Sequence, residues 1–281
     1  MSETDKVFSG PIPEFYERYL VPLIFDPYAR DIAARVAVAR PQRVLEIAAG
    51  TGIVTRALVS QLPVTTQIVA TDLNPPMLEH AKTLIGQDDK IEWKTADAQN
   101  LPFEDESFDA VVCQFGVMFF SDKARAFKEA RRVLKSSGQY YFSVWDKIAN
   151  NEFAELVTQA LEEMFPNDPP RFLARTPHGH NDIDILRSGL KGAGFTSISA
   201  DAVDARSRAP SPWEPALAYV QGTPLRNEVE ARGPARLEEA TTRASQAIAE
   251  RFGTAEVDVR IRAYVVTAAR SDRDADYSSV G

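Results

Sequence analysis

A carboxylate followed closely by two glycines is the first feature of this sequence that could do chemistry. In the stretch VLEIAAGTGIVTRAL, residues 44–58, Glu46 lies near the end of a short apolar run, and Gly50 and Gly52 separate that run from apolar residues at helical spacing. Glycine allows positive φ and a close approach of a ligand to the backbone. The pattern predicts a strand, a tight binding loop and a helix, although glycines here also serve simply to pack a helix against a strand.

Thr55 argues against a dinucleotide at this loop. It occupies the position of the third glycine in the GxGxxG fingerprint, and the Glu46 carboxylate would repel a pyrophosphate. A ligand with an ammonium group suits this carboxylate, and S-adenosylmethionine is such a ligand. A second acid, Asp72, follows another apolar run at residues 67–70, twenty residues after Gly52. A ribose diol is usually held at such a strand tip.

From residue 43 to residue 146 the chain resembles the class I S-adenosylmethionine-dependent methyltransferases. The resemblance continues through TDLNPPMLEHA, TADAQNLPFEDESFDAVVCQFGVMFF and RRVLKSSGQYYFSVWD, in the family's order and spacing. It looks closest to the branch of quinone-biosynthesis C-methyltransferases and many small-molecule O- and N-methyltransferases. Ala48 departs from the pattern, because the family most often has glycine there. This departure affects the expected conformation of the loop more than the expected ligand.

The resemblance implies which residues hold S-adenosylmethionine and its product, S-adenosylhomocysteine. The first loop would contact the methionine part and the second acid the ribose, while later strand ends would contact the adenine and form the floor. Met77 as a core residue and Asp97 as a turn former are the plainer alternatives. The expected cofactor-binding residues are Glu46, Ala48, Gly50, Gly52, Asp72, Leu73, Met77, Asp97, Ala98, Gln114 and Phe115.

Strands alternate with helices along most of the chain, and this rhythm predicts a parallel, doubly wound sheet. Ligands of such sheets bind outside the carboxyl ends of the strands, where Glu46, Asp72, Asp97 and Gln114 converge. With the resemblance, the expected fold is a Rossmann-like α/β sheet of seven mostly parallel strands, with an antiparallel last strand and helical cap insertions. The expected strands are residues 44–47, 67–72, 91–94, 110–114, 139–144, 196–203 and 257–268.

The N-terminal region predicts two helices, at residues 13–20 and 26–39, the second with Asp26 as its N-cap. In the resembling family such helices lie across the cofactor site. Tyr16, Tyr19 and Phe25 are therefore candidates for a lid or for substrate contact, as is Trp145 further along the chain. Aromatic packing without a ligand is the alternative.

Residues 209–256 hold three helical patterns, at 213–221, 224–231 and 234–252, where the minimal fold needs only a hairpin. We predict a cap over the substrate site, and a homodimer surface is the alternative. The predicted divisions are N-terminal helices 1–40, cofactor-binding core 41–146, helical insertion and sixth strand 147–208, cap 209–256, last strand 257–270 and loose tail 271–281.

Composition limits the partners. The 281 residues carry a formal net charge of −8, with a pI near 5.1, so no basic stripe is available for a nucleic acid. Cys113 is the single cysteine, which excludes intramolecular disulfides and suits a reducing compartment. Without a long apolar stretch or a signal-peptide pattern, we expect a cytoplasmic protein with no stable membrane anchor.

Methyl transfer is an in-line displacement that needs positioning and exclusion of water but no metal. No strong motif marks a catalytic base. His178 and His180, in TPHGHND, are the candidates, because imidazole accepts protons near neutral pH, and hydrogen bonding to loop backbone is the alternative. The first functional hypothesis is methyl transfer to a small apolar metabolite, of which an aromatic one is an example. The second is a cofactor-binding protein without turnover, such as a sensor or partner subunit.

Overall fold

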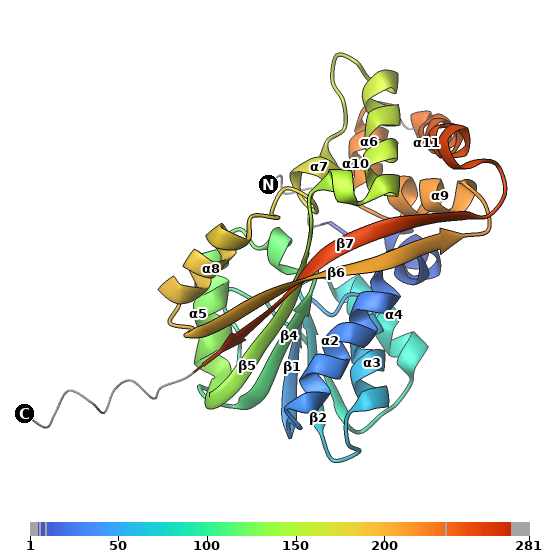
Figure 1. Ribbon diagram of the computed structural model, residues 1–281. Coiled ribbons are helices and arrows are strands. Elements are labelled where there is room, and N and C mark those ends of the chain that lie inside the picture. Colours follow the sequence, from blue (N-terminus) through green and yellow to red (C-terminus); the bar gives the residue numbers. More distant parts are fainter. Residues whose placement is uncertain (1–4, 6, 9, 234, 271–281) are drawn as a thin grey trace, which may run out of the picture.

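The computed structural model describes residue 5, residues 7–8, 10–233 and 235–270. The predicted loose tail at 271–281 and the first residue of the helix predicted at 234–252 lie outside the described residues. Seven strands form one sheet in the order β3-β2-β1-β4-β5-β7-β6 (Figure 1). Their bounds are β1 Arg43–Ile47, β2 Gln67–Asp72, β3 Ile91–Thr95, β4 Phe108–Gln114, β5 Leu134–Trp145, β6 Ser197–Ala209 and β7 Val257–Ala269.

Strand directions confirm the predicted fold class. β1 pairs in parallel with β2 and β4, as do β2 with β3 and β4 with β5. β7 runs antiparallel to both β5 and β6. The carboxyl ends of β1, β2 and β4 therefore lie at one edge of the sheet, where the predicted binding residues follow them.

Helices cover both faces of the sheet (Figure 1). Side chains of a strand alternate between faces, and in β5 Tyr140 and Phe142 pack with Phe127 on one face whereas Tyr141 packs in a separate cluster on the other. The helices that cover these faces are α2 Asp26–Val38, α3 Ile53–Gln61, α4 Pro75–Ile85, α5 Lys123–Val133 and α8 Ile183–Gly192.

The two predicted N-terminal helices form one uninterrupted stretch. It consists of α1 Ile12–Phe15, the π-helix η2 Tyr16–Phe25 and α2. Pro22 lies inside η2; its missing N–H removes one hydrogen bond from the helical ladder, and the Asp26 N–H reaches back five residues to the Val21 carbonyl. The prediction of Asp26 as an N-cap was wrong, because the helix continues through it. π-Helical turns are rare and occur frequently at functional sites.

Two strand boundaries also differ from the prediction. The fifth strand is predicted to begin at residue 139, after the serines and glycine at 136–138, but β5 begins at Leu134. A register irregularity against β4 between Phe108 and Ala110 accommodates the extra residues. β6 continues past residue 203 to Ala209, because the charged residues on its open face pair with β7; Arg262 binds Asp204 at 2.7 Å and Arg206 binds Asp258 at 2.7 Å.

A group of helices lies at the end of the long β6–β7 hairpin (Figure 1). It contains α6 Glu152–Met164, α7 Phe172–Arg175, α9 Trp213–Gln221, α10 Leu225–Ala231 and α11 Arg236–Phe252, and short 3₁₀ turns lie at η3 Val117–Phe119 and η4 Ile148–Asn150. Helix α11 packs against α9 and α6, and α9 packs against η2. Over the described ranges, no helix has the length and apolarity needed to cross a membrane.

Candidate functional site

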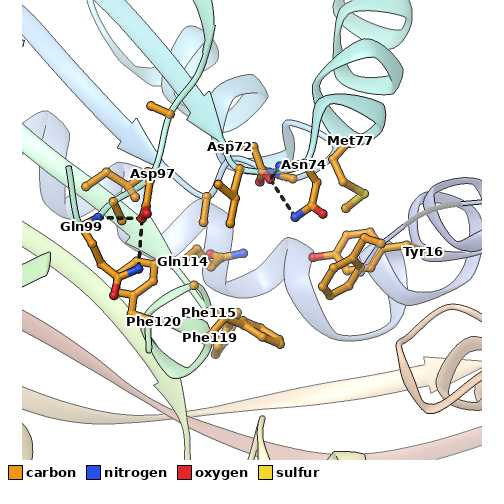
Figure 2. A pocket seen from close by; sticks show the side chains of 18 residues that line it. Tyr16, Asp72, Asn74, Met77, Asp97, Gln99, Gln114, Phe115, Phe119 and Phe120 are labelled. Carbon is orange, nitrogen blue, oxygen red and sulfur yellow. Dashed lines mark hydrogen bonds between the residues drawn. The ribbon is translucent and has the colours of Figure 1, made fainter. Parts of the chain in front are cut away.

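A cavity opens at the carboxyl ends of β1, β2 and β4. Its volume is about 760 Å³, part of it open to solvent. Figure 2 shows side chains from the strand ends and from Tyr16 of η2 directed toward it. The lining residues are Phe8, Tyr16, Ile47, Ala48, Gly50, Asp72, Leu73, Asn74, Met77, Ala96, Asp97, Ala98, Gln99, Gln114, Phe115, Gly116, Phe119 and Phe120. We call this space the first cavity.

The loop after β1 has the backbone geometry that its glycines predict. Gly50 and Gly52 adopt φ values of 58° and 82°, and Ala48 also has a positive φ, of 56°. A Cβ atom added to Gly52 would lie 3.1 Å from Ile85 Cδ1, so this glycine also permits close packing of the helix. Gly52 therefore has the packing role considered as the alternative, and Gly50 lines the first cavity. Ligand binding by this loop stays a prediction.

Asp72 connects the first two strand ends. Its side chain is 6% exposed, and its two carboxylate oxygens accept hydrogen bonds from the backbone N–H groups of Gly50 and Asn74, both at 2.8 Å. Burial raises the pKa of Asp72 above its ordinary value, and these N–H groups oppose the shift. The carboxylate still has acceptor capacity on the cavity side, because a carboxylate offers about four lone-pair sites.

Asp97 is the turn former considered as its alternative, and its contact with an adenine stays a prediction. Its carboxylate accepts hydrogen bonds from the Gln99 N–H at 2.9 Å and from Gln99 Nε2 at 3.1 Å, as a turn former does, and it also lines the first cavity (Figure 2). Met77 is likewise a buried residue that lines the cavity. Leu73, half exposed, completes this apolar end together with Ala98.

The floor of the first cavity contains a strained residue. Phe115 has a φ of 52°, and its N–H is shared between the carbonyl and the hydroxyl of Ser143, at 3.1 and 3.2 Å. Its ring stacks on Trp145 with centroids 3.9 Å apart and planes 4° apart. Positive φ at a bulky residue is costly and clusters at functional sites. Beside it, Gln114 Oε1 is buried without a hydrogen-bond partner among the described residues.

Glu46 is not among the residues that line the first cavity. Its carboxyl group is 2% exposed and accepts a hydrogen bond from Thr55 Oγ1 at 2.6 Å, and burial raises its pKa to about 8. This contact explains the threonine at the third-glycine position, since its hydroxyl partners the buried acid. Direct contact of Glu46 with an ammonium group stays a prediction.

A second cavity of about 520 Å³, part of it open space, adjoins the first. Phe8, Tyr16, Phe115 and Phe119 line both, so the two spaces meet at these aromatic rings. The further lining residues come from η2, the end of β5, the segment around α7 and the α9–α10 turn, and they are Leu20, Ile24, Phe25, Met118, Trp145, Phe172, Leu173, Pro177, His178, Tyr219, Thr223 and Pro224.

The two candidate histidines have different surroundings. His178 is 6% exposed and lines the second cavity, with Nδ1 2.8 Å from the carbonyl oxygen of Asp146. Burial lowers its pKa to about 4. His180 is half-buried and lines neither cavity, and burial followed by the Lys123 charge lowers its pKa. His178 thus makes the contact with loop backbone that was the alternative to a catalytic role, and it also lines a cavity.

Of the predicted lid residues, three line a cavity and one does not. Tyr16 lines both cavities, and Phe25 and Trp145 line the second. Tyr19 lines neither and instead packs beside Phe15, with ring centroids 5.9 Å apart. In the predicted cap, Tyr219 and the turn after α9 reach the second cavity, whereas α11 packs behind α9 and α6.

Several lining residues were not among the predicted site residues. Asn74 and Gln99 each follow a predicted acid by two residues, and Phe119 and Phe120 lie in the motif that supplied Gln114; these spacings could have identified them. Tyr219 carries no comparable signal in the sequence, because only the packing of α9 on η2 brings it to the cavity.

Comparisons with known proteins confirm the resemblance. Residues 45–142 match the methyltransferase domain family. The chain is 30% identical over 172 residues to a demethylmenaquinone methyltransferase of Clavibacter sepedonicus, an alignment that covers 58% of this chain and 69% of the relative. It is 31% identical over 173 residues to the ubiquinone/menaquinone biosynthesis C-methyltransferase UbiE of Escherichia coli, covering 57% and 69%. The crystal structure of the YcgJ protein from Bacillus subtilis shares the fold, with a TM-score of 0.57 at 18% identity over 88% of this chain and 99% of that one.

The chain therefore belongs to the class I S-adenosylmethionine-dependent methyltransferases, and it is an enzyme of that class. Within the family, its curated relatives place it in the branch related to quinone-biosynthesis methyltransferases.

Proposed function

We propose that this methyltransferase binds S-adenosylmethionine in the first cavity and transfers the methyl group to a small molecule held in the second. The observation that carries the proposal is the contact between the two cavities at four shared aromatic residues. A donor and an acceptor in adjoining spaces can approach to about 3 Å, which an in-line displacement requires.

The first cavity fits the cofactor chemically. The Asp72 carboxylate is preorganised by two backbone N–H groups and has lone pairs left for a ribose diol. Leu73, Met77 and Ala98 offer apolar contact to an adenine ring, and Asp97 also lines this cavity. Gln114 Oε1 is a buried acceptor with no partner in the described part of the chain, and an ammonium group would satisfy it.

S-adenosylmethionine, when bound, supplies an electrophilic methyl group on a sulfonium: the carbon–sulfur bond breaks as the bond from the acceptor oxygen, nitrogen or carbon forms, and S-adenosylhomocysteine remains. The protein's part is to orient and enclose. Tyr16 and Phe115 line both spaces and exclude water where they meet. The acceptor's proton leaves to solvent or to a base.

Calorimetry with S-adenosylhomocysteine tests the cofactor site, and incubation of the protein with methyl-labelled S-adenosylmethionine and fractionated small metabolites tests turnover. We expect saturable binding and a labelled product in a small-molecule fraction. Binding without a labelled product in any fraction would favour the alternative of a sensor or partner subunit. Absence of binding would contradict the assignment of the first cavity.

A further inference from the structure

Within the part of the chain that the structure describes, the walls of the second cavity carry no ionic side chain. Its described lining residues include no Asp, Glu, Lys or Arg, and those with a polar side-chain atom are Tyr16, Trp145, His178, Tyr219 and Thr223. Moving an ion from water into such a space costs several kcal/mol unless a counter-charge receives it. An acceptor that is itself a carboxylate, a phosphate or an ammonium ion would find no opposite charge there.

Phe115 and Trp145 line this cavity as a stacked aromatic pair. Both residues line the space, with parallel rings 3.9 Å apart, and Phe25 lies 5.5 and 6.0 Å from their centroids. Aromatic rings prefer offset-stacked or edge-to-face partners. A planar ring system therefore finds matching surfaces in this cavity.

His178, which lines the second cavity, carries a hydrogen-bond acceptor. Its Nδ1 is 2.8 Å from the Asp146 carbonyl oxygen, and a carbonyl only accepts, so Nδ1 carries the proton and Nε2 carries the lone pair. Nε2 forms no hydrogen bond with any residue that the structure describes. Burial lowers the pKa of His178 to about 4, which keeps the ring neutral at neutral pH.

The other polar groups differ in how well they are satisfied. The Thr223 hydroxyl donates to the Tyr219 carbonyl at 2.7 Å and accepts from the Leu225 N–H at 3.2 Å, so it is occupied. The Tyr219 hydroxyl forms no hydrogen bond within the described ranges, and burial raises its pKa well above the ordinary value. Tyr16 directs its hydroxyl toward the first cavity, within 3.9 Å of a Cβ atom built on Gly50 (Figure 2).

We infer that the methyl acceptor is an uncharged aromatic compound whose hydroxyl or N–H group donates a hydrogen bond to His178 Nε2, and that His178 is a specificity-determining residue. This inference rests on the proposed function, because it treats the second cavity as the acceptor site. A compound of this class would pair with Nε2, which forms no hydrogen bond among the described residues. A cation held only by aromatic faces is the competing occupant.

Binding of matched two-ring probes tests the inference without requiring turnover. The protein, saturated with S-adenosylhomocysteine, is titrated with 1-naphthol, 1-methoxynaphthalene, 1-naphthoate and 1-naphthylmethylammonium. We expect 1-naphthol to bind about tenfold more tightly than its methyl ether, which lacks the donor, and more tightly than either ion. Tighter binding of the ammonium probe would overturn the inference in favour of a cation site.

Variants assign the preference to one residue. His178→Asn retains an N–H group that can reach the Asp146 carbonyl but lacks Nε2, so the ratio of naphthol to methyl-ether affinity should fall close to one. His180→Asn is the matched control in the same loop, outside both cavities, and should leave the ratio unchanged. His178→Phe, which keeps a planar ring, gives a second test should the asparagine variant unfold.

The affinity for S-adenosylhomocysteine, measured on each variant, separates the two levels of the argument. If the wild-type protein does not bind S-adenosylhomocysteine, the proposed function is contradicted. Normal cofactor affinity with equal binding of naphthol and its ether, or a preference that persists in both His178 variants, would contradict the inference alone.

Discussion

Asp72→Ala should weaken the binding of S-adenosylhomocysteine without preventing folding. The Asp72 carboxylate lies at the carboxyl end of β2, is 6% exposed, and holds the Gly50 and Asn74 N–H groups at 2.8 Å. Alanine removes the acceptor proposed for the ribose diol and also releases the Gly50 N–H, which shapes the loop of the first cavity. Both changes should weaken the binding of S-adenosylhomocysteine.

The size of the effect follows from these contacts. A hydrogen bond to a charged group contributes about 1.5 to 3 kcal/mol, so its removal should raise the dissociation constant about 10- to 150-fold. Isothermal titration calorimetry at constant salt and pH measures this ratio directly. Thermal unfolding of the free variant shows whether the loss of affinity reflects a damaged fold.

Asp88→Ala is the matched control. Asp88 also accepts a hydrogen bond from a backbone N–H two residues on, that of Lys90 at 3.0 Å, but it precedes β3 and so lies at the opposite edge of the sheet from the first cavity. Its replacement should leave cofactor affinity within about twofold of the wild type. Equal affinities for Asp72→Ala and the wild type would refute the ribose role and leave Asp72 as a loop-shaping residue.

Three further predictions concern stability. Gly52→Ala should lower the free energy of unfolding by about 2 kcal/mol, because a Cβ atom at φ 82° is strained and lies 3.1 Å from Ile85; urea unfolding measures this, and Gly192→Ala, in open helical space, should cost nothing. The pKa of His178, about 4 when folded against about 6.5 unfolded, means that the folded state binds fewer protons between these values. Stability should therefore fall by about 3 kcal/mol as pH drops from 6.5 to 4, a dependence that His178→Asn should lack. Burial raises the pKa of Glu46 to about 8, so its stabilising contribution is present below pH 4.5 and lost as pH rises through 8. Glu46→Gln should exceed the wild type in stability above pH 8, and parallel pH profiles of the two proteins would contradict this.

The cofactor side of the site was predictable because its signals are local. A strand, a loop and a helix within fifteen residues of sequence carry Glu46, Gly50 and Gly52, and each later strand end adds its polar residue in chain order. Parallel topology then brings those ends to one edge whatever the details of the helices. Glu46 shows the limit of this reasoning. The sequence indicates an acid near the loop, but it does not show that the acid is buried and accepts a hydrogen bond from the Thr55 hydroxyl.

Secondary-structure boundaries failed where tertiary pairing outweighs local preference. Serine and glycine at 136–138 favour a turn in isolation, yet the neighbouring strands extend β5 back to Leu134 through an irregular register. Pro22 favours a break between helices, yet the chain continues as a π-helix whose side chains cover both cavities. In each case the missing information lies in a distant segment of the chain.

The second cavity could not be assembled from the sequence, because its walls come from segments far apart in the chain. Tyr16, Phe115, Trp145, His178 and Tyr219 meet there only after the sheet, the N-terminal helix and α9 have packed together. A search by residue type does find both histidines of the HGH loop. It does not separate them, since they are two residues apart and chemically identical. The carbonyl oxygen of Asp146, just after β5, accepts a hydrogen bond from Nδ1 of His178, which lines the second cavity. His180 lines neither cavity, so packing distinguishes the two histidines where the sequence does not.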